Sequence, residues 1–199
     1  MGETVAHQRY AAGRRFVLLL TCWLLPAAAT AAAALSNQLA HHPSPYLAMH
    51  GEDPVHWQPW SEATLQKARA LNRPLLISIG YFSCHWCHVM QRESYRDAAI
   101  AAILNEHFVP VKVDRELHGA LDGHLIDFME KTHGRAGWPL NVFLTPEGYP
   151  LVGATYLPVE RFQELLERLS ASWSEDHEKL RNLARRTALQ LMLQAAQPD

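Results

Sequence analysis

The sequence has little cysteine and no excess of charge of either sign. Three cysteines in 199 residues are too few for a scaffold built on disulfides. Eighteen Lys and Arg residues against 20 Asp and Glu residues give a formal net charge of −2, which argues against a general nucleic-acid binder. Blocks of like charge and internal repeats are absent, which excludes a fibrous chain. With 48% hydrophobic residues, the chain is long enough for one globular domain of ordinary size.

The amino-terminal residues have the composition of an export signal. Three arginines precede an uncharged, mostly apolar run at 16–25 (FVLLLTCWLL), and the small residues after Pro26 suit cleavage between about Ala29 and Ala34. We therefore predict a signal peptide over residues 1–34 and a periplasmic or secreted protein. An uncleaved membrane anchor is the alternative, because the alanines that follow extend the apolar run toward the roughly 20 residues that span a bilayer. The sequence predicts no other contact with a membrane.

The rest of the chain alternates between strand and helix patterns. Residues 36–60, rich in Pro, His and aromatic residues, predict a packed but irregular lead-in. Apolar spacing predicts helices at 61–71, at 85–106 with a break near Ser94, and at 119–131, 159–169 and 177–194. Short apolar runs predict buried strands at 75–79, 108–113, 141–144 and 151–154. The first two strands and the helix between them form a βαβ unit, and the last two form a hairpin.

This order of elements is typical of a thioredoxin-like α/β sandwich, in which a central mixed sheet is flanked by helices. A cysteine pair stands where the first strand passes into a helix. We expect the thioredoxin-like domain to span residues 35–173 and to be followed by a C-terminal helical tail over residues 174–199.

The segment Cys84-His85-Trp86-Cys87-His88 is the centre of the functional hypothesis. As a dithiol, Cys84 would lie at the first turn of a helix, where unpaired N–H groups and the helix dipole stabilise a thiolate. Its pKa is then lowered and it acts as the nucleophile, while Cys87, one turn further on, resolves the mixed disulfide. His85 and His88 are supporting residues, because an imidazolium beside Cys84 favours its thiolate. Trp86 places a bulky apolar group before the resolving cysteine.

Three other interpretations of the pair remain open. The string satisfies C-x-x-C-H, the attachment motif of a c-type haem, although a strand directly before the pair and a hairpin after it serve no purpose for a haem. Zinc held by both cysteines, His88 and another histidine lacks the second paired-ligand motif that structural zinc sites usually show. The two cysteines could also be an inert buried pair. We favour the redox pair and predict neither a cofactor nor a metal.

Gly137-Trp138-Pro139 precedes the third strand. A proline before a strand is often only a feature of a sheet edge. The functional interpretation is a cis-proline loop packed against the cysteines, whose backbone groups pair with an extended substrate. Trp138 and Pro139 are therefore the candidate substrate-docking residues.

Several longer strings occur together in the chain: SPYL at 44–47, SIGYFSCHWCHVMQRES at 78–94, VKVDRE at 111–116 and GWPLNVFLTPEG at 137–148. Through them, residues 37–158 resemble the thioredoxin-like domain at the front of the spermatogenesis-associated thioredoxin-like proteins and their bacterial relatives. The resemblance implies a thioredoxin fold, Cys84 and Cys87 as the redox pair, and Pro139 at the cis-proline position. Larger members continue into a helical domain similar to sugar epimerases, which this chain is too short to hold, so no carbohydrate activity is expected.

One position departs from thioredoxin proper. Ser78, six residues before Cys84, stands where thioredoxins keep a buried acid. Removing the proton from Cys87 therefore needs another group, for which His88, Asp114 and water are the candidates.

We expect an exported thiol-disulfide oxidoreductase that acts on protein thiols and disulfides, as a reductase or isomerase with an external electron donor. The alternatives are a non-catalytic binding module of the same fold and a protein that carries haem or a metal through CHWCH.

Overall fold

The computed structural model describes residues 1–2 and 35–196. The predicted signal peptide, with its cleavage region at 29–34, lies outside the described residues apart from Met1 and Gly2. The described residues from Leu35 onward belong to one compact unit. In this part of the chain no helix is both long and apolar enough to cross a membrane.

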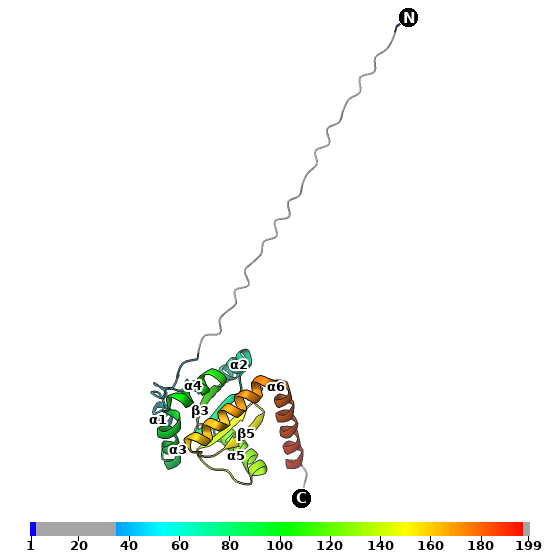
Figure 1. Cartoon of the computed structure of the whole chain (residues 1–199). Coiled ribbons are helices and arrows are strands. Elements are labelled where there is room, and N and C mark those ends of the chain that lie inside the picture. The colour runs from blue at the N-terminus through cyan, green and yellow to red at the C-terminus, as the bar shows by residue number, and fades with distance from the viewer. Residues whose placement is uncertain (3–34, 197–199) are drawn as a thin grey trace. The chain divides into compact units, whose positions relative to one another are not determined.

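A five-stranded mixed sheet forms the centre of the fold (Figure 1). Its strands, in the spatial order β1-β3-β2-β4-β5, are Gln58–Pro59, Val109–Asp114, Leu75–Gly80, Leu140–Leu144 and Pro150–Ala154. The pairs β1/β3 and β3/β2 are parallel, whereas β2/β4 and β4/β5 are antiparallel. Every residue of β2, β3 and β4 is buried, as expected of strands covered on both faces. The predicted thioredoxin-like sandwich is therefore present.

Seven helical segments accompany the sheet within the described residues. They are α1 (Pro45–Ala48), α2 (Glu62–Leu71), α3 (His85–Met90), the π-helix η1 (Gln91–Tyr95), α4 (Ala98–His107), α5 (Gly119–His133) and α6 (Val159–Ala195). Ser61 is the N-cap of α2, and its Oγ accepts a hydrogen bond from the Thr64 amide at 3.2 Å, as the serine at the start of the predicted helix leads one to expect. The helix ends at Asn72, which takes the left-handed conformation at φ 50° that asparagine tolerates.

The alternating side chains of β2 divide the core into two layers. Leu76 belongs to the layer that packs under α1, α3, α4 and the first half of α6. Leu75, Ile77 and Ile79 belong to the other layer, which α2 and α5 cover. Because side chains two residues apart in a strand share a face, Ser78 and Gly80 lie on the side of Leu76, under α3. The residues after β2 therefore bring the cysteine pair onto that face.

The predicted lead-in needs correction, whereas the two predicted C-terminal helices are confirmed. The lead-in is packed as expected, but it also contains α1 and the short strand β1, which the sequence pattern did not predict. The two C-terminal helices predicted at 159–169 and 177–194 are present on either side of a kink at Asp176, whose φ of −154° is not helical, and the first continues beyond residue 169 to the kink. Figure 1 shows the change of direction between the orange and the dark red parts of α6. Trp173, just before the kink, donates its Nε1 hydrogen to the Asn72 carbonyl at 2.9 Å and anchors this part of α6.

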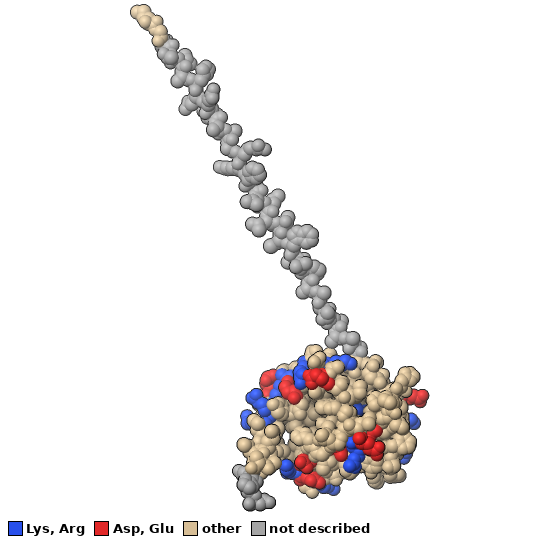
Figure 2. Space-filling model, turned by 180° about the vertical axis from the view of Figure 1, so that it is seen from behind, with Lys and Arg blue, Asp and Glu red and all other residues tan. Residues whose placement is uncertain are grey.

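Charged residues of both signs are interspersed on the surface. On the face shown in Figure 2, blue and red residues lie close to one another around a broad uncharged area. The formal charge of −2 is therefore not gathered into one field of a single sign on this face.

Candidate active site

The cysteine pair lies where β2 passes into α3, as the sequence predicts. Cys84 is the N-cap of α3, and its amide donates to the Tyr81 carbonyl at 3.1 Å. The sulfur atoms of Cys84 and Cys87 are joined as a disulfide, with the two Cα atoms 5.3 Å apart. Cys84 keeps 4% of its surface exposed and Cys87 none, so Cys84 is the more accessible of the two.

A backbone N–H points at the sulfur of Cys84. The amide of Cys87 donates to Cys84 Sγ at 3.3 Å, which is the bond a capping side chain makes at the start of a helix. A donor at this place stabilises negative charge on the sulfur more than it stabilises the neutral thiol. The local backbone therefore favours a thiolate at Cys84 in the reduced protein.

The two predicted supporting histidines, His85 and His88, contact residues that lie near them in the sequence. His88 Nε2 lies 2.7 Å from the Phe82 carbonyl oxygen, and since a carbonyl only accepts, this nitrogen carries the proton. His85 is exposed, and its ring meets the ring of Trp86 edge-on at 5.6 Å between centroids. His88 thus ties α3 to the loop after β2, and its Nε2 is not a free base.

Aromatic side chains lie on the segments that adjoin the pair. We define the aromatic rim as Tyr81, Phe82, Trp86, Trp138 and Tyr156. Phe82 and Trp86 are 57% and 51% exposed, and Trp86 packs against Tyr156 with centroids 4.8 Å apart. The Tyr156 hydroxyl donates to Glu93 Oε2 at 2.6 Å, and this hydrogen bond raises the pKa of Tyr156. The rim offers apolar surface beside the disulfide.

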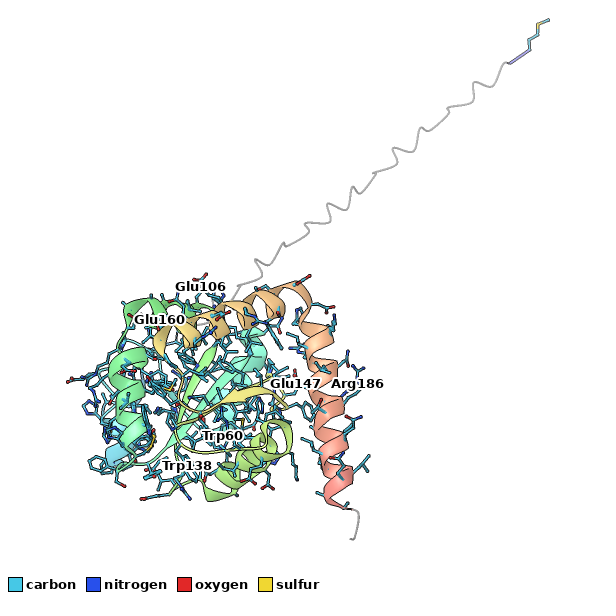
Figure 3. All side chains as sticks on the ribbon, turned by 60° about the horizontal axis from the view of Figure 1, so that its bottom comes forward. Trp60, Glu106, Trp138, Glu147, Glu160 and Arg186 are labelled. Atoms are coloured by element: carbon cyan, nitrogen blue, oxygen red, sulfur yellow. A yellow bond between two sulfur atoms is a disulfide. The ribbon has the colours of Figure 1, made fainter. Side chains whose placement is uncertain are left out.

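The loop with Trp138 and Pro139 enters β4 beside the cysteine pair. The Trp138–Pro139 peptide bond is cis, and the next residue, Leu140, pairs with Ile79 at the end of β2. Figure 3 labels Trp138. Its Nε1 hydrogen is donated to Asp122 Oδ1 at 2.8 Å, and the Arg115 guanidinium lies 3.9 Å from its ring centroid. Because Arg115 also contacts Asp122 at 3.5 Å, the indole is held from two sides.

A buried polar cluster lies on the same face of the sheet as the cysteines. Lys112 of β3 is fully buried, and its ammonium nitrogen donates to Ser78 Oγ at 2.9 Å. The nitrogen also lies over the rings of Tyr95, Trp57 and Tyr46, at 4.4, 5.1 and 5.5 Å from their centroids. Burial lowers the pKa of Lys112 to about 7, although Asp53 partly opposes the shift.

The hydroxyl of Tyr95 joins this cluster to β4. It lies 2.9 Å from Ser78 Oγ and donates to Asn141 Oδ1 at 2.8 Å. Burial raises the pKa of Tyr95 above its ordinary value, so the group stays a neutral phenol. Sequence reasoning noticed Ser78 but missed Lys112, although a lysine inside the apolar run of β3 is itself an unusual feature.

Asp53, in the lead-in, is the centre of a second set of buried hydrogen bonds. Its two oxygens take contacts from His50 Nδ1 at 2.6 Å, Trp57 Nε1 at 3.1 Å and Gln91 Nε2 at 2.9 Å. Burial and the nearby Lys112 lower the pKa of His50 to about 4, against the opposing effect of Asp53. His50 is therefore neutral at pH 7, and its contact with Asp53 is a hydrogen bond and not an ion pair.

Asp114, another predicted proton acceptor, already accepts hydrogen bonds on both of its carboxylate oxygens. Its Oδ2 accepts from the Ser44 hydroxyl at 2.6 Å and its Oδ1 accepts from the Glu116 amide at 3.0 Å. Asp114 thus fixes the lead-in and the turn after β3. Among the described residues, no group of three or more His, Cys, Asp or Glu side chains is arranged to hold a metal ion.

Comparison with known proteins identifies the family to which this chain belongs. Residues 36–192 match the family profile Thioredox_DsbH, described as "Protein of unknown function, DUF255". Spermatogenesis-associated protein 20 of Homo sapiens is 40% identical over 162 residues, which are 78% of this chain and 21% of that protein. An uncharacterized protein of Caenorhabditis elegans is 40% identical over 151 residues, 73% of this chain and 21% of that protein. The chain therefore spans about a fifth of the length of these relatives.

Two solved structures are also similar. One is titled DsbH oxidoreductase, with 20% identity, a TM-score of 0.42 and coverage of 56% of this chain and 85% of that chain. The other is a thioredoxin from Thermus thermophilus, with 20% identity and a TM-score of 0.47. The match covers 58% of this chain and 87% of the thioredoxin. The resemblance noted in the sequence is confirmed by the profile and the relatives. The chain belongs to the Thioredox_DsbH family of thioredoxin-like proteins, described as DUF255.

Proposed function

We propose that this domain is a thiol-disulfide oxidoreductase that exchanges disulfides with protein clients through Cys84 and Cys87. The observation that carries the proposal is the position of Cys84, the more exposed sulfur of the pair, as an N-cap that accepts the Cys87 amide. That contact favours the thiolate, which is the form that attacks a disulfide. The family to which the chain belongs and its thioredoxin-like fold support the same reaction.

The proposed cycle transfers two electrons to the client. The Cys84 thiolate attacks one sulfur of a client disulfide, forms a mixed disulfide and releases the other client sulfur as a thiolate, which takes a proton from solvent. Cys87 then loses its proton and attacks Cys84 Sγ, which releases the second client thiolate and leaves the Cys84–Cys87 disulfide. An external dithiol donor reduces this disulfide again. The client is reduced and the donor is oxidised, so electrons balance.

The aromatic rim and the Trp138–Pro139 loop are the proposed docking surface. Trp138 is held by Asp122 and Arg115, so the loop beside the disulfide is fixed before a client arrives. An extended client segment would lie along this loop with apolar side chains against Phe82 and Trp86, which are more than half exposed.

Export remains part of the proposal, on the composition of residues 1–34 alone. In a periplasmic or extracellular compartment, protein disulfides are available as substrates. Such a protein would need an electron donor that reaches the same compartment.

Trapping of clients tests the proposal. With Cys87→Ser, the cycle should stop at the mixed disulfide on Cys84, and covalent adducts with disulfide-containing proteins should accumulate on non-reducing gels. Cys84→Ser is the matched control and should trap almost nothing, because Cys87 is fully buried. Reduction of insulin by the wild-type protein with dithiothreitol should be lost in both variants. Absence of adducts with Cys87→Ser, or insulin reduction that survives either substitution, would leave the fold as a binding module without this chemistry.

A further inference from the structure

The hydroxyl of Tyr46 is buried without a hydrogen-bond partner. Tyr46 lies on α1 with 1% of its surface exposed, and its Oη makes no hydrogen bond to the described residues. Leaving a buried hydroxyl unpaired costs free energy, and such groups are rare in folded proteins. The sequence analysis assigned Tyr46 no role beyond its place in the SPYL string.

The Tyr46 hydroxyl and the sulfur of the resolving cysteine, Cys87, border the same small space. Gly80, the last residue of β2, leaves open the space into which Tyr46 Oη and Cys87 Sγ both extend. A Cβ atom at Gly80 would overlap the Tyr46 oxygen and would stand only 2.6 Å from the Cys87 sulfur. The glycine therefore permits the phenol and the sulfur to approach one another on the inner face of the sheet.

We propose that Tyr46 is a positioning residue for the resolving step, whose hydroxyl donates a hydrogen bond to the sulfur of Cys87 when the disulfide is open. This inference rests on the proposed redox function of the pair. A disulfide sulfur carries no charge and accepts hydrogen bonds weakly, so the hydroxyl has no strong partner in the oxidised form. A thiolate is a strong acceptor, and a donor at this point lowers the pKa of the Cys87 thiol.

Tyr46 can act only as a donor here, because it keeps its proton. Burial raises the pKa of Tyr46 well above its ordinary value, and Tyr95, Asp114 and Asp53 add to the shift. In the resolving step the Cys87 thiol gives its proton to a base in solvent, and Tyr46 shares its own proton without losing it. The Cys87 thiolate then attacks Cys84 Sγ, and the client thiolate leaves.

The state of the other ionisable groups on this face explains why a hydroxyl donor matters for Cys87. The other ionisable groups of this buried face are Lys112 and Asp114 of β3, Tyr95 of η1, and the lead-in pair His50 and Asp53. Asp114 and Asp53 are bound to other partners, His50 is neutral at pH 7, and Lys112 donates to Ser78. Ser78, at the position where thioredoxins keep a buried acid, has no acidic side chain. Tyr46 thus provides the hydroxyl donor beside Cys87.

The test isolates the resolving step with a small probe. A mixed disulfide between Cys84 and 5-thio-2-nitrobenzoate is prepared, and attack by Cys87 releases the coloured thiolate. Tyr46→Phe should slow this release about tenfold near pH 7 and raise the midpoint of its pH profile by about one unit, as expected when a charge-assisted hydrogen bond is lost. At pH values above both midpoints, the rates of variant and wild type should converge.

Tyr95→Phe is the matched control. Tyr95 is as buried as Tyr46, but its hydroxyl is bonded to Ser78 and Asn141 in the oxidised form, so its loss should lower stability and leave the midpoint unchanged. The oxidised Tyr46→Phe protein should be no less stable than wild type, because the hydroxyl it loses is unpaired. An unchanged rate and midpoint in Tyr46→Phe, or the same shift in Tyr95→Phe, would overturn the inference.

A second measurement uses the unmutated protein and does not depend on how the variant folds. In reduced protein labelled with ¹³C at tyrosine Cζ, the Tyr46 signal should follow the titration of Cys87, and a signal insensitive to that titration contradicts the hydrogen bond. These readouts need no protein client. If the release rate depends on Tyr46 but the chain reduces no protein disulfide, the inference stands and the proposed client activity fails.

Discussion

At the scale of single residues, the two cysteines have different surroundings. Cys84 receives a backbone N–H and retains some exposure, whereas Cys87 is fully enclosed between α1, α3 and the end of β2. The proposed division of labour, in which Cys84 attacks and Cys87 resolves, rests on this difference. In the proposed cycle, the amide of Cys87 stabilises the reduced Cys84 as a thiolate, and burial keeps Cys87 from competing for clients.

The thiol pKa of Cys84 is the first quantity to measure. In the Cys87→Ser variant we expect Cys84 to titrate clearly below the ordinary cysteine value of about 8.5, because the amide at position 87 still points at its sulfur. The rate of alkylation by iodoacetamide as a function of pH gives the value. Cys84→Ser, which leaves only Cys87, serves as the control and should react slowly. An ordinary thiol pKa at Cys84 would remove the basis for its role as nucleophile.

The residues of the site differ in how far the sequence predicts them. Cys84, Cys87, Trp138 and Pro139 stand in short contiguous motifs, so local sequence was enough to place them at a strand end. Tyr46 and Lys112 come from segments far from the motif, and only the closed fold brings them together. Of the proton acceptors that the sequence leaves open for Cys87, the two side chains, His88 and Asp114, are hydrogen-bonded to Phe82 and Ser44.

At the scale of elements, the end of β2 has little free space. Gly80→Ala would push a methyl group against Tyr46 and Cys87, and we expect a loss of about 1–3 kcal/mol in the free energy of unfolding of the oxidised protein. Urea unfolding measures it. Gly123→Ala in α5 is the control, since no atom lies within 4 Å of its added Cβ, and it should be neutral or stabilising by about 0.5–1 kcal/mol. Equal effects at the two positions would contradict the close packing at Gly80.

The support of the Trp138 loop can be tested by Asp122→Ala. This change removes the acceptor of the indole N–H and the partner of Arg115, so the loop should lose its fixed position. The KM for a protein disulfide should rise about fivefold, which corresponds to roughly 1 kcal/mol for one lost hydrogen bond. Reaction of Cys84 with a small disulfide should not change, because it needs no docking surface. An unchanged KM, or an equal loss with the small disulfide, would argue against docking at this loop.

Elements were predicted best where periodicity is strong. The central strands, α2 and α5 follow from apolar spacing and from capping residues such as Ser61. The two-residue strand β1 has too few residues to show a period, and it is defined only by its pairing with β3. The break within 85–106 was predicted, but the π-helical form of η1 was not, because hydrophobic periodicity does not distinguish it.

At the scale of the whole molecule, stability should depend on pH through two buried bases. Burial lowers the pKa of Lys112 from its ordinary value of 10.5 to about 7, and that of His50 from 6.5 to about 4. In both cases the unfolded chain binds more protons between the two values, so the free energy of unfolding rises with pH across each window. Stability should therefore increase from about pH 4 to 6.5 through His50, and again above about pH 7 through Lys112.

Lys112→Met tests the contribution of Lys112. The variant should lose the rise above pH 7, and at pH 6 it should be more stable than wild type by an amount of the order of 3 kcal/mol, because no buried charge remains. Urea unfolding at pH 6 and pH 9.5 gives the comparison. Lys179→Met, at an exposed position of α6, should follow the wild-type curve. Wild-type stability that does not increase between these pH values would contradict a neutral buried amine.

The redox equilibrium of the Cys84–Cys87 couple tests the central claim most directly. Incubation of the purified protein in glutathione buffers of graded potential, followed by acid quench and thiol counting, gives its reduction potential. We expect a reversible two-electron transition at an intermediate value, clearly more reducing than the roughly −120 mV of a dedicated disulfide-forming enzyme. A value near −120 mV would contradict the reductase or isomerase direction, and a pair that does not interconvert reversibly would contradict the redox function itself.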